Sequence, residues 1–242
     1  MEELLLRIVP GLSEQWKGAT PDAIAQIERI AGRPLPSFYR WFLNRMGQSM
    51  GPLAYPTLDF SAQRVLSCYA KKLVVPEQRF LLIAYESDEV MPLHLFYDFT
   101  APAREDALVT TRAAQEGELS DDFETLREML AWGAFSLFRV EGMPQMCSGS
   151  LKGNDPDFLS DLDLLMSSLG FTSPISTGPL CRLYERHDAT MICRGTPRAG
   201  RGNRRTFNLG GRNAGTLRRI LGEITTQSSL EVKVKDWAPA LR

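Results

Sequence analysis

Histidine is scarce in this chain, since only two of its 242 residues are histidines. Imidazole is the most common metal ligand and the main acid–base group near neutral pH, so this scarcity restricts both kinds of chemistry. His94 lies within an apolar run and His187 within an expected turn, and neither has further ligands at metal-binding spacing. We therefore expect neither a metal site nor a cofactor.

Cysteine is sparse as well and shows no metal-binding or redox pattern. The four cysteines, Cys68, Cys147, Cys181 and Cys193, are far apart in the sequence and form no CxxC pair. This spacing fits neither a zinc knuckle nor a thioredoxin-type site. We expect free thiols, as is usual for proteins of a reducing compartment.

Long apolar runs are missing. No uncharged apolar segment approaches the roughly 20 residues that a membrane-spanning helix needs. The first residues, MEELLLRIVPGLSEQW, are acidic where a secretory signal is basic, and Arg7 and Pro10 interrupt their short apolar run. The sequence therefore predicts a cytoplasmic protein without a membrane partner, although secretion by a route without a signal stays open.

Catalytic motifs are absent or incomplete, which predicts that the protein is not an enzyme. No G-x-S-x-G nucleophile motif occurs. The stretch 210-GGRNAGT-216 has the glycine spacing of a phosphate-binding loop, but Thr216 directly follows Gly215 where the motif needs a lysine. A glycine-rich strand end followed by a capped helix explains this stretch better. The pair Asp157 and Asp161 is likewise best explained as the solvated face of a helix.

Charge is unevenly distributed, although the net charge is only −1. Residues 1–141 carry 20 acidic and 14 basic residues, whereas residues 142–242 carry 9 acidic and 14 basic residues. Near this change of sign, residues 141–154 are rich in glycine and serine and lack any periodicity. We therefore predict a domain at 1–140, a linker at 141–154 and a smaller basic α+β module at 155–242.

Helix and strand signals occur in both modules, which predicts an α+β fold with helices packed on antiparallel strands. Before 141, capped apolar patterns predict helices at 20–31, 37–46, 61–70 and from 120 onward, with strands at 79–85 and 93–99. After the linker, we expect a helix from Asp155 to Leu169, strands at 180–185, 189–194, 205–209 and 231–235, and a helix at 215–227.

The stretch 32-GRPLPSFYRWFLNRMG-47 carries a family resemblance. Its prolines separate two helices, and most of its four aromatic residues within 38–42 are best placed in the core beside that junction. Together with the preceding helix and the Asp-Asp-Phe-x-x-Leu segment at 121–126, it resembles the SUKH superfamily over residues 15–138. The motif positions of that family read Ile24, Glu28, Gly32, Leu35, Pro36, Tyr39, Leu43 and Gly47.

This resemblance implies a non-catalytic scaffold that binds a partner protein. In bacteria the partner of such domains is commonly a secreted toxin, often a nuclease or deaminase, which the domain neutralises. Related domains of eukaryotes and large DNA viruses leave a regulatory scaffold with several partners as the alternative. Met46-Gly47 stands where the family usually has Asn-Gly, and the strand pair lacks the family's common Gly-Asp turn, so the subfamily stays open.

Two charged segments are the candidate contact surfaces. An acidic loop with Glu86, Asp88 and Glu89 is expected between the two strands of the first module, and an acidic surface suits the basic clefts of nucleases. The segment 194-RGTPRAGRGNRR-205 is expected at a hairpin tip of the second module. Its candidate contact residues are Arg198, Arg201, Arg204 and Arg205.

Three interpretations of this arginine-rich tip stay open, namely a solvated tip, a docking loop for an acidic protein, and a nucleic-acid contact. No stacking aromatic residues are interleaved with the arginines, and the whole chain is slightly acidic, so binding of a nucleotide or nucleic acid is the least favoured alternative. Asp121 and Asp122 form a further acidic patch, for which helix capping is the alternative role.

Overall fold

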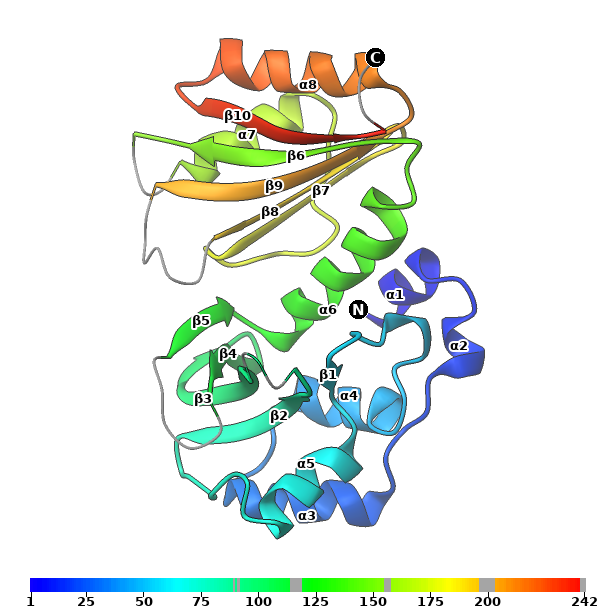
Figure 1. Ribbon diagram of the computed structural model, residues 1–242, viewed down its shortest axis with the longest axis vertical. Helices are drawn as coiled ribbons and strands as arrows, with labels where there is room; N and C mark the ends of the chain where they lie inside the picture. The colour runs from blue at the N-terminus through cyan, green and yellow to red at the C-terminus, as the bar shows by residue number, and fades with distance from the viewer. Residues whose placement is uncertain (89, 91, 114–118, 155–157, 196–202, 240–242) are drawn as a thin grey trace. The chain divides into compact units, whose positions relative to one another are not determined.

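The chain has a mixed α+β fold with two antiparallel sheets (Figure 1). The computed structural model describes residues 1–88, 90, 92–113, 119–154, 158–195 and 203–239. It divides into two compact units, Met1–Leu130 and Ala131–Arg242. Within the described residues, no helix is long and apolar enough to cross a membrane.

The first unit is a set of helices packed on a five-stranded antiparallel sheet. Its strands follow one another in the sheet in chain order, as β1 (Leu58–Asp59), β2 (Phe80–Glu86), β3 (His94–Ala103), β4 (Asp106–Arg112) and β5 (Ser120–Phe123). Its helical segments are α1 (Glu2–Ile8), α2 (Leu12–Gln15), α3 (Pro21–Ala31), α4 (Ser37–Met46), the 3₁₀ turn η1 (Gly51–Leu53), α5 (Ala62–Ala70) and the first half of α6 (Leu126–Phe135).

Helices α3 and α5 begin and end where the sequence predicts. The Thr20 hydroxyl accepts the backbone N–H of Ala23 at the start of α3, and Gly32 ends that helix in the left-handed conformation with φ of 62°. The Ser61 hydroxyl accepts the backbone N–H of Arg64 and caps α5 in the same way. A local side chain thus satisfies one of the free N–H groups at the start of each helix.

Helix α4 differs from the prediction at its first residue only. Ser37 is not a cap, because its hydroxyl donates to Glu105 and Pro36 occupies the capping position. The predicted burial is confirmed, since Phe38, Tyr39 and Phe42 are all at most 5% exposed. Their rings stack or meet edge to face with other aromatic rings of the unit, including Tyr97 of β3.

The helix predicted from residue 120 onward is wrong at its start. Ser120–Phe123 instead form the edge strand β5, and α6 begins at Leu126, where the Thr125 hydroxyl accepts the backbone N–H of Glu128. Asp121 and Asp122 therefore have no capping role. Strand β4, which lies between β3 and β5, was not predicted at all.

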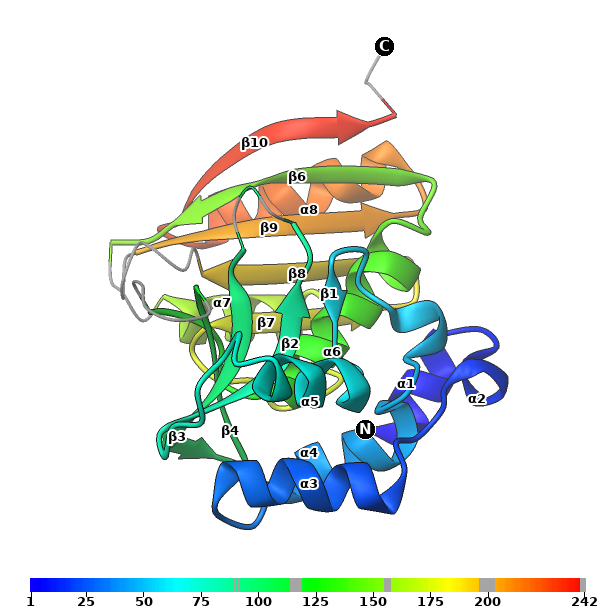
Figure 2. The same ribbon diagram turned by 60° about the horizontal axis from the view of Figure 1, so that its bottom comes forward.

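The second unit is also an antiparallel sheet covered by helices, with a different strand order. Its elements are the π-helical turn η2 (Ser136–Val140), β6 (Gln145–Lys152), α7 (Leu159–Ser168), β7 (Cys181–Arg186), β8 (Ala189–Gly195), β9 (Arg204–Gly211), α8 (Ala214–Gln227) and β10 (Glu231–Ala238). The order in the sheet is β10-β6-β9-β8-β7, so β6 lies between β10 and β9 (Figure 2). One face of the sheet packs against α7 and α8 around a core that includes Leu151, Leu162, Phe207 and Ile224.

The predicted linker at 141–154 is mostly a strand. Residues 145–152 form β6, which pairs with β10 on one side and β9 on the other. A Cβ on Gly149 would lie 2.2 Å from the carbonyl oxygen of Lys233 and 2.8 Å from the Phe207 ring, so this close-packed position requires glycine. Gly149, which contributes to the linker-like composition, is thus explained by the tight packing of an interior strand.

The remaining predicted elements of the second unit are present with small shifts of their ends. Residues 155–157, where a helix start was predicted, lie outside the described residues, and α7 begins at Leu159. Asn213 caps α8 by accepting the backbone N–H of Thr216, 2.8 Å from its side-chain oxygen. The stretch 210-GGRNAGT-216 is therefore the end of β9 followed by a capped helix.

Candidate functional site

The residues that carry the family resemblance hold the junction of α3 and α4 together. The Glu28 carboxylate accepts the backbone N–H of Leu35 at 3.2 Å and forms an ion pair with Arg40. Leu35, Tyr39 and Leu43 are buried, as is Ile24. Gly32 and Gly47 end the two helices, and Pro36 precedes the second. All eight positions thus have structural roles at this junction.

In the described part of the acidic loop after β2, two carboxylates accept backbone N–H groups of the loop itself. Glu86 Oε1 accepts the backbone N–H of Asp88 at 2.8 Å, and Asp88 Oδ1 accepts that of Val90 at 2.9 Å. Glu86 Oε2 also accepts the Thr57 hydroxyl at 2.9 Å. Glu86 is partly exposed and Asp88 exposed, whereas Glu89 lies outside the described residues. The loop therefore presents negative charge in a defined geometry.

Two further contacts attach this loop to the sheet. The carbonyl oxygen of Thr57, next to β1, accepts both the backbone N–H and the hydroxyl of Ser87. On the other side, His94 Nδ1 accepts the backbone N–H of Glu86 at 3.0 Å. Burial lowers the pKa of His94, Glu86 opposes this effect and Arg64 adds to it, so the ring stays neutral at pH 7 and keeps Nδ1 free to accept.

A groove with a volume of about 310 Å³ lies beside the acidic loop. Most of its lining comes from one continuous segment between α4 and α5, and Ser87 of the loop completes it. The lining combines apolar side chains with hydroxyl, amide and carboxylate groups, and includes Gln48, Met50, Tyr55, Thr57, Asp59 and Phe60. This groove was not predicted, although residues 48–61 contain Gly51, Pro52 and Pro56 and lack periodicity, which is the usual sign of a surface loop.

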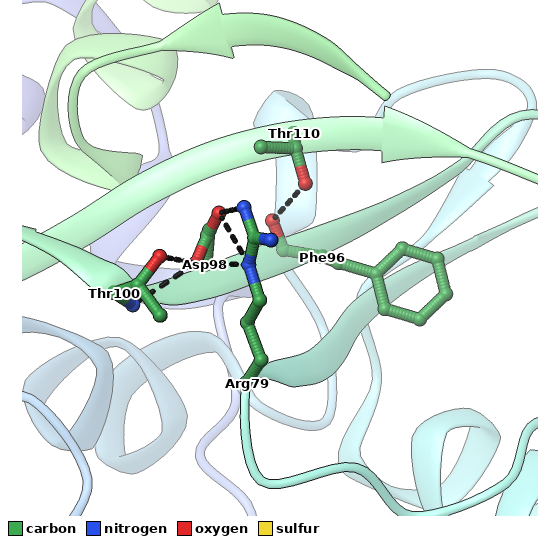
Figure 3. Close-up of polar contacts among 5 residues, drawn as sticks. All are labelled: Arg79, Phe96, Asp98, Thr100 and Thr110. Carbon is green, nitrogen blue, oxygen red and sulfur yellow. Dashed lines mark hydrogen bonds and ion pairs between the residues drawn. The ribbon is translucent and has the colours of Figure 1, made fainter. Parts of the chain in front are cut away.

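A second group of charges in the first unit has a structural role. Arg79 binds the carboxylate of Asp98 through two nitrogens, with 2.6 Å between Nη2 and Oδ2 (Figure 3). Asp98 Oδ1 also accepts the backbone N–H and the hydroxyl of Thr100. Burial raises the pKa of Asp98, but these hydrogen bonds outweigh it and hold that pKa below its usual value. The pair fixes β3 where its register with β4 shifts.

The predicted acidic patch at Asp121 and Asp122 does not form one surface. The two residues are adjacent in β5, where Asp121 is exposed and Asp122 is buried. Asp121 is opposite Thr110 and Phe123 is opposite Val109, so Asp122 is the extra residue of a β-bulge, where the regular alternation of side chains is interrupted. Asp121 alone contributes exposed charge.

Of the predicted basic residues of the second unit, Arg204 and Arg205 are successive residues of β9 and point to opposite faces of the sheet. Arg204 is exposed and donates to the Ser150 hydroxyl at 3.0 Å. Arg205 is only 6% exposed, and its guanidinium carbon lies 5.8 Å from the centre of the Phe158 ring. Burial and then Arg182 lower the pKa of Arg205. Arg198 and Arg201 lie outside the described residues, so Arg204 is the candidate contact residue that the structure places on the surface.

No group of three or more His, Cys, Asp or Glu side chains that could hold a metal ion occurs within the described ranges. Comparison with family models, with curated proteins and with solved structures returned no match.

Proposed function

We propose that this protein is a cytoplasmic, non-catalytic immunity protein that binds one cognate secreted bacterial toxin and neutralises it by occlusion. The docking surface is the acidic loop with Glu86 and Asp88, together with the groove beside it. The SUKH-like motif supports the class of protein. The observation that carries the choice of surface is the set of hydrogen bonds that Glu86, Ser87 and Asp88 make, because contacts already present in the free protein lower the conformational entropy lost on binding.

Charge also supports this surface. Residues 1–141 carry an excess of six acidic residues, and toxins that act on nucleic acids have basic clefts. An acidic loop beside a groove would therefore speed the encounter with such a cleft and orient the complex. Thr57 and Ser87 keep the loop against the rim of the groove, so both features would contact the same partner.

Co-expression with the toxin encoded beside this protein tests the proposal. The wild type should restore growth and form a complex that survives gel filtration. Asp88→Asn keeps an oxygen that accepts the Val90 N–H but removes the charge, so it should slow association about tenfold at low salt. Glu3→Gln removes an exposed charge in α1 and is the matched control, which should bind like the wild type.

Two outcomes would reject the proposal. Absence of both rescue and complex formation would remove the immunity role. Capture of several weaker partners in a pull-down, with no dominant protein of toxin size, would favour the regulatory scaffold instead. Equal binding by Asp88→Asn and the wild type would leave the immunity role intact but place the docking surface elsewhere.

A further inference from the structure

On the face opposite α7 and α8, the sheet of the second unit has a polar area over β6, β9 and β10. Cys147 of β6 and Leu209 of β9 point into the core beside α7 and α8. Because successive side chains alternate, Ser148 and Asn208, which are opposite each other, point to the other face. Asp236 of β10 is also opposite Ser148, so a hydroxyl, an amide and a carboxylate are neighbours on this face.

The π-helical turn η2 adds a second carboxylate. In this turn the backbone N–H of Glu141 donates to the carbonyl oxygen of Ser136, five residues earlier, at 2.9 Å. The wider turn brings the two side chains together, and the Ser136 hydroxyl donates to Glu141 Oε1 at 3.2 Å. Single π-helical turns at the ends of α-helices occur frequently at functional sites.

A pocket of about 270 Å³ lies between this turn and the polar area. Its lining includes Ser136, Val140 and Glu141 from the turn, Met146 and Ser148 from β6, Asn208 from β9, and Asp236 from β10. The volume corresponds to about nine water molecules at roughly 30 Å³ each. It is smaller than a typical pocket for a drug-sized ligand and suits one extended side chain or a small amine.

The pocket carries two carboxylates that no lysine or arginine of the described residues neutralises. Glu141 accepts the Ser136 hydroxyl, and Asp236 accepts the Ser148 hydroxyl at 3.4 Å. Both hydroxyls therefore act as donors to the carboxylates. In the part of the chain that the structure describes, neither carboxylate forms an ion pair with a lysine or arginine. An anionic ligand would be repelled, whereas a cation with N–H groups could donate to both.

We propose that this pocket binds an organic cation, an alkylguanidinium or alkylammonium group seated between Glu141 and Asp236. Its alkyl stem would pack on Met146 and Val140, and the side-chain oxygen of Asn208 would accept a further N–H. The cation could belong to an arginine side chain of a protein or to a free small amine, since both present the same chemistry. This site lies wholly in the second unit and is independent of the acidic loop.

Basic residues occur on the same face but farther along the strands. Lys152 lies four residues after Ser148 in β6, which is roughly 13 Å at the rise of a strand. Arg204, opposite Lys152, is engaged by Ser150. Lys233 is opposite Ser150, two residues from Ser148, and is therefore nearer to the pocket than Lys152. The polar area is thus acidic at its η2 end and mainly basic at its other end. A ligand with one cationic and one anionic group would therefore bind with its cation towards η2.

Titration of the whole protein with butylguanidinium, followed by amide chemical shifts, tests the proposal. We expect saturable shifts at residues 136–141, 146–148 and 208. Butylurea has the same shape without the charge and should bind about tenfold more weakly or less. Glu141→Gln and Asp236→Asn should each weaken butylguanidinium binding about tenfold. Both residues are exposed, so the unfolding midpoint of each variant should match the wild type.

Glu231→Gln is the matched control, because Glu231 is an exposed carboxylate of the same strand, opposite Lys152 at the far end of the face. It should leave binding unchanged. Equal binding of butylurea, absence of saturation, or undiminished binding in both pocket variants would each overturn the proposal. A short peptide with one central arginine then distinguishes the sources, since it binds if the natural ligand is a protein side chain and is excluded if only free amines fit.

Discussion

The carboxylate of Glu28 in α3 accepts the backbone N–H of Leu35 across the loop that leads to α4. The same carboxylate pairs with Arg40. We expect Glu28→Ala to lower the free energy of unfolding by about 1–2 kcal/mol, because a partly buried N–H would lose its acceptor. Arg40→Ala removes only the ion pair of exposed side chains and should cost less than about 1 kcal/mol. Urea unfolding measures the free energy of unfolding of both variants. An equal loss in Glu28→Ala and Arg40→Ala would show that the hydrogen bond to the Leu35 N–H contributes little.

Asp106 makes the stability of the first unit depend on pH. Its carboxylate accepts the backbone N–H of Arg127 at 3.2 Å at the start of α6, and burial raises its pKa from 3.8 to about 6, against the effect of its hydrogen bonds. Because the folded pKa is higher, this contribution to stability is fully present below about pH 4 and is lost as pH rises through 6.

Asp106→Asn should remove this dependence. Between pH 4 and 7 the wild type should lose about 2–3 kcal/mol of unfolding free energy relative to the Asn variant. Urea unfolding at several pH values measures the free energy of unfolding of both proteins. In the difference between them, the contributions of the other titrating groups cancel. Parallel curves for the two proteins would contradict a raised pKa.

Gly149 should tolerate no side chain. A Cβ there would lie 2.2 Å from the Lys233 carbonyl oxygen, so Gly149→Ala should force β6 and β10 apart and destabilise the second unit by about 2–4 kcal/mol. Gly222→Ala is the control, since nothing lies within 4 Å of a Cβ at that helical position. It should stabilise the protein by about 0.5–1 kcal/mol. Thermal unfolding compares the midpoints of the two variants with that of the wild type. Similar midpoints for Gly149→Ala and Gly222→Ala would contradict the close packing of β6 around Gly149.

The four cysteines should be inert in the native protein. All are buried free thiols, and burial raises the pKa of Cys68 and Cys193 and raises that of Cys147 to about 12. Since the thiolate is the reactive form, a thiol reagent at pH 8 should modify none of them within minutes and all of them after unfolding in urea. Rapid reaction of any one thiol before unfolding would contradict this.

Local signals predicted most helices, but they failed where a segment's role depends on distant neighbours. Thr20 and Ser61 cap helices whose first turns they contact directly, so sequence alone located them. Ser120–Phe123 has the composition of a helix start, yet it pairs with β4 and becomes a strand. Gly149 contributes to a composition that is typical of linkers, yet it is required in β6 because the two neighbouring strands leave no room for a side chain.

The candidate surfaces were predictable only in part, for the same reason. The acidic loop lies where the sequence placed it, between β2 and β3. Its attachment to Thr57 was not predictable, because the Thr57 hydroxyl and the Glu86 carboxylate are 29 residues apart in the chain. The division of Arg204 and Arg205 between two faces follows from strand pairing, which composition does not reveal.

The position of η2 determines how this protein can be cut for expression. Val140 closely contacts Gly210 of β9, since a Cβ on Gly210 would lie 2.7 Å from the Val140 carbonyl oxygen. A C-terminal fragment that starts at 141, where the composition changes, would leave this glycine-lined surface of the sheet open to water. A fragment that starts at 131 keeps η2, which covers Gly210 and supplies Ser136 to the lining of the pocket. A fragment cut where the composition changes would thus lose both the cover of Gly210 and one wall of the pocket.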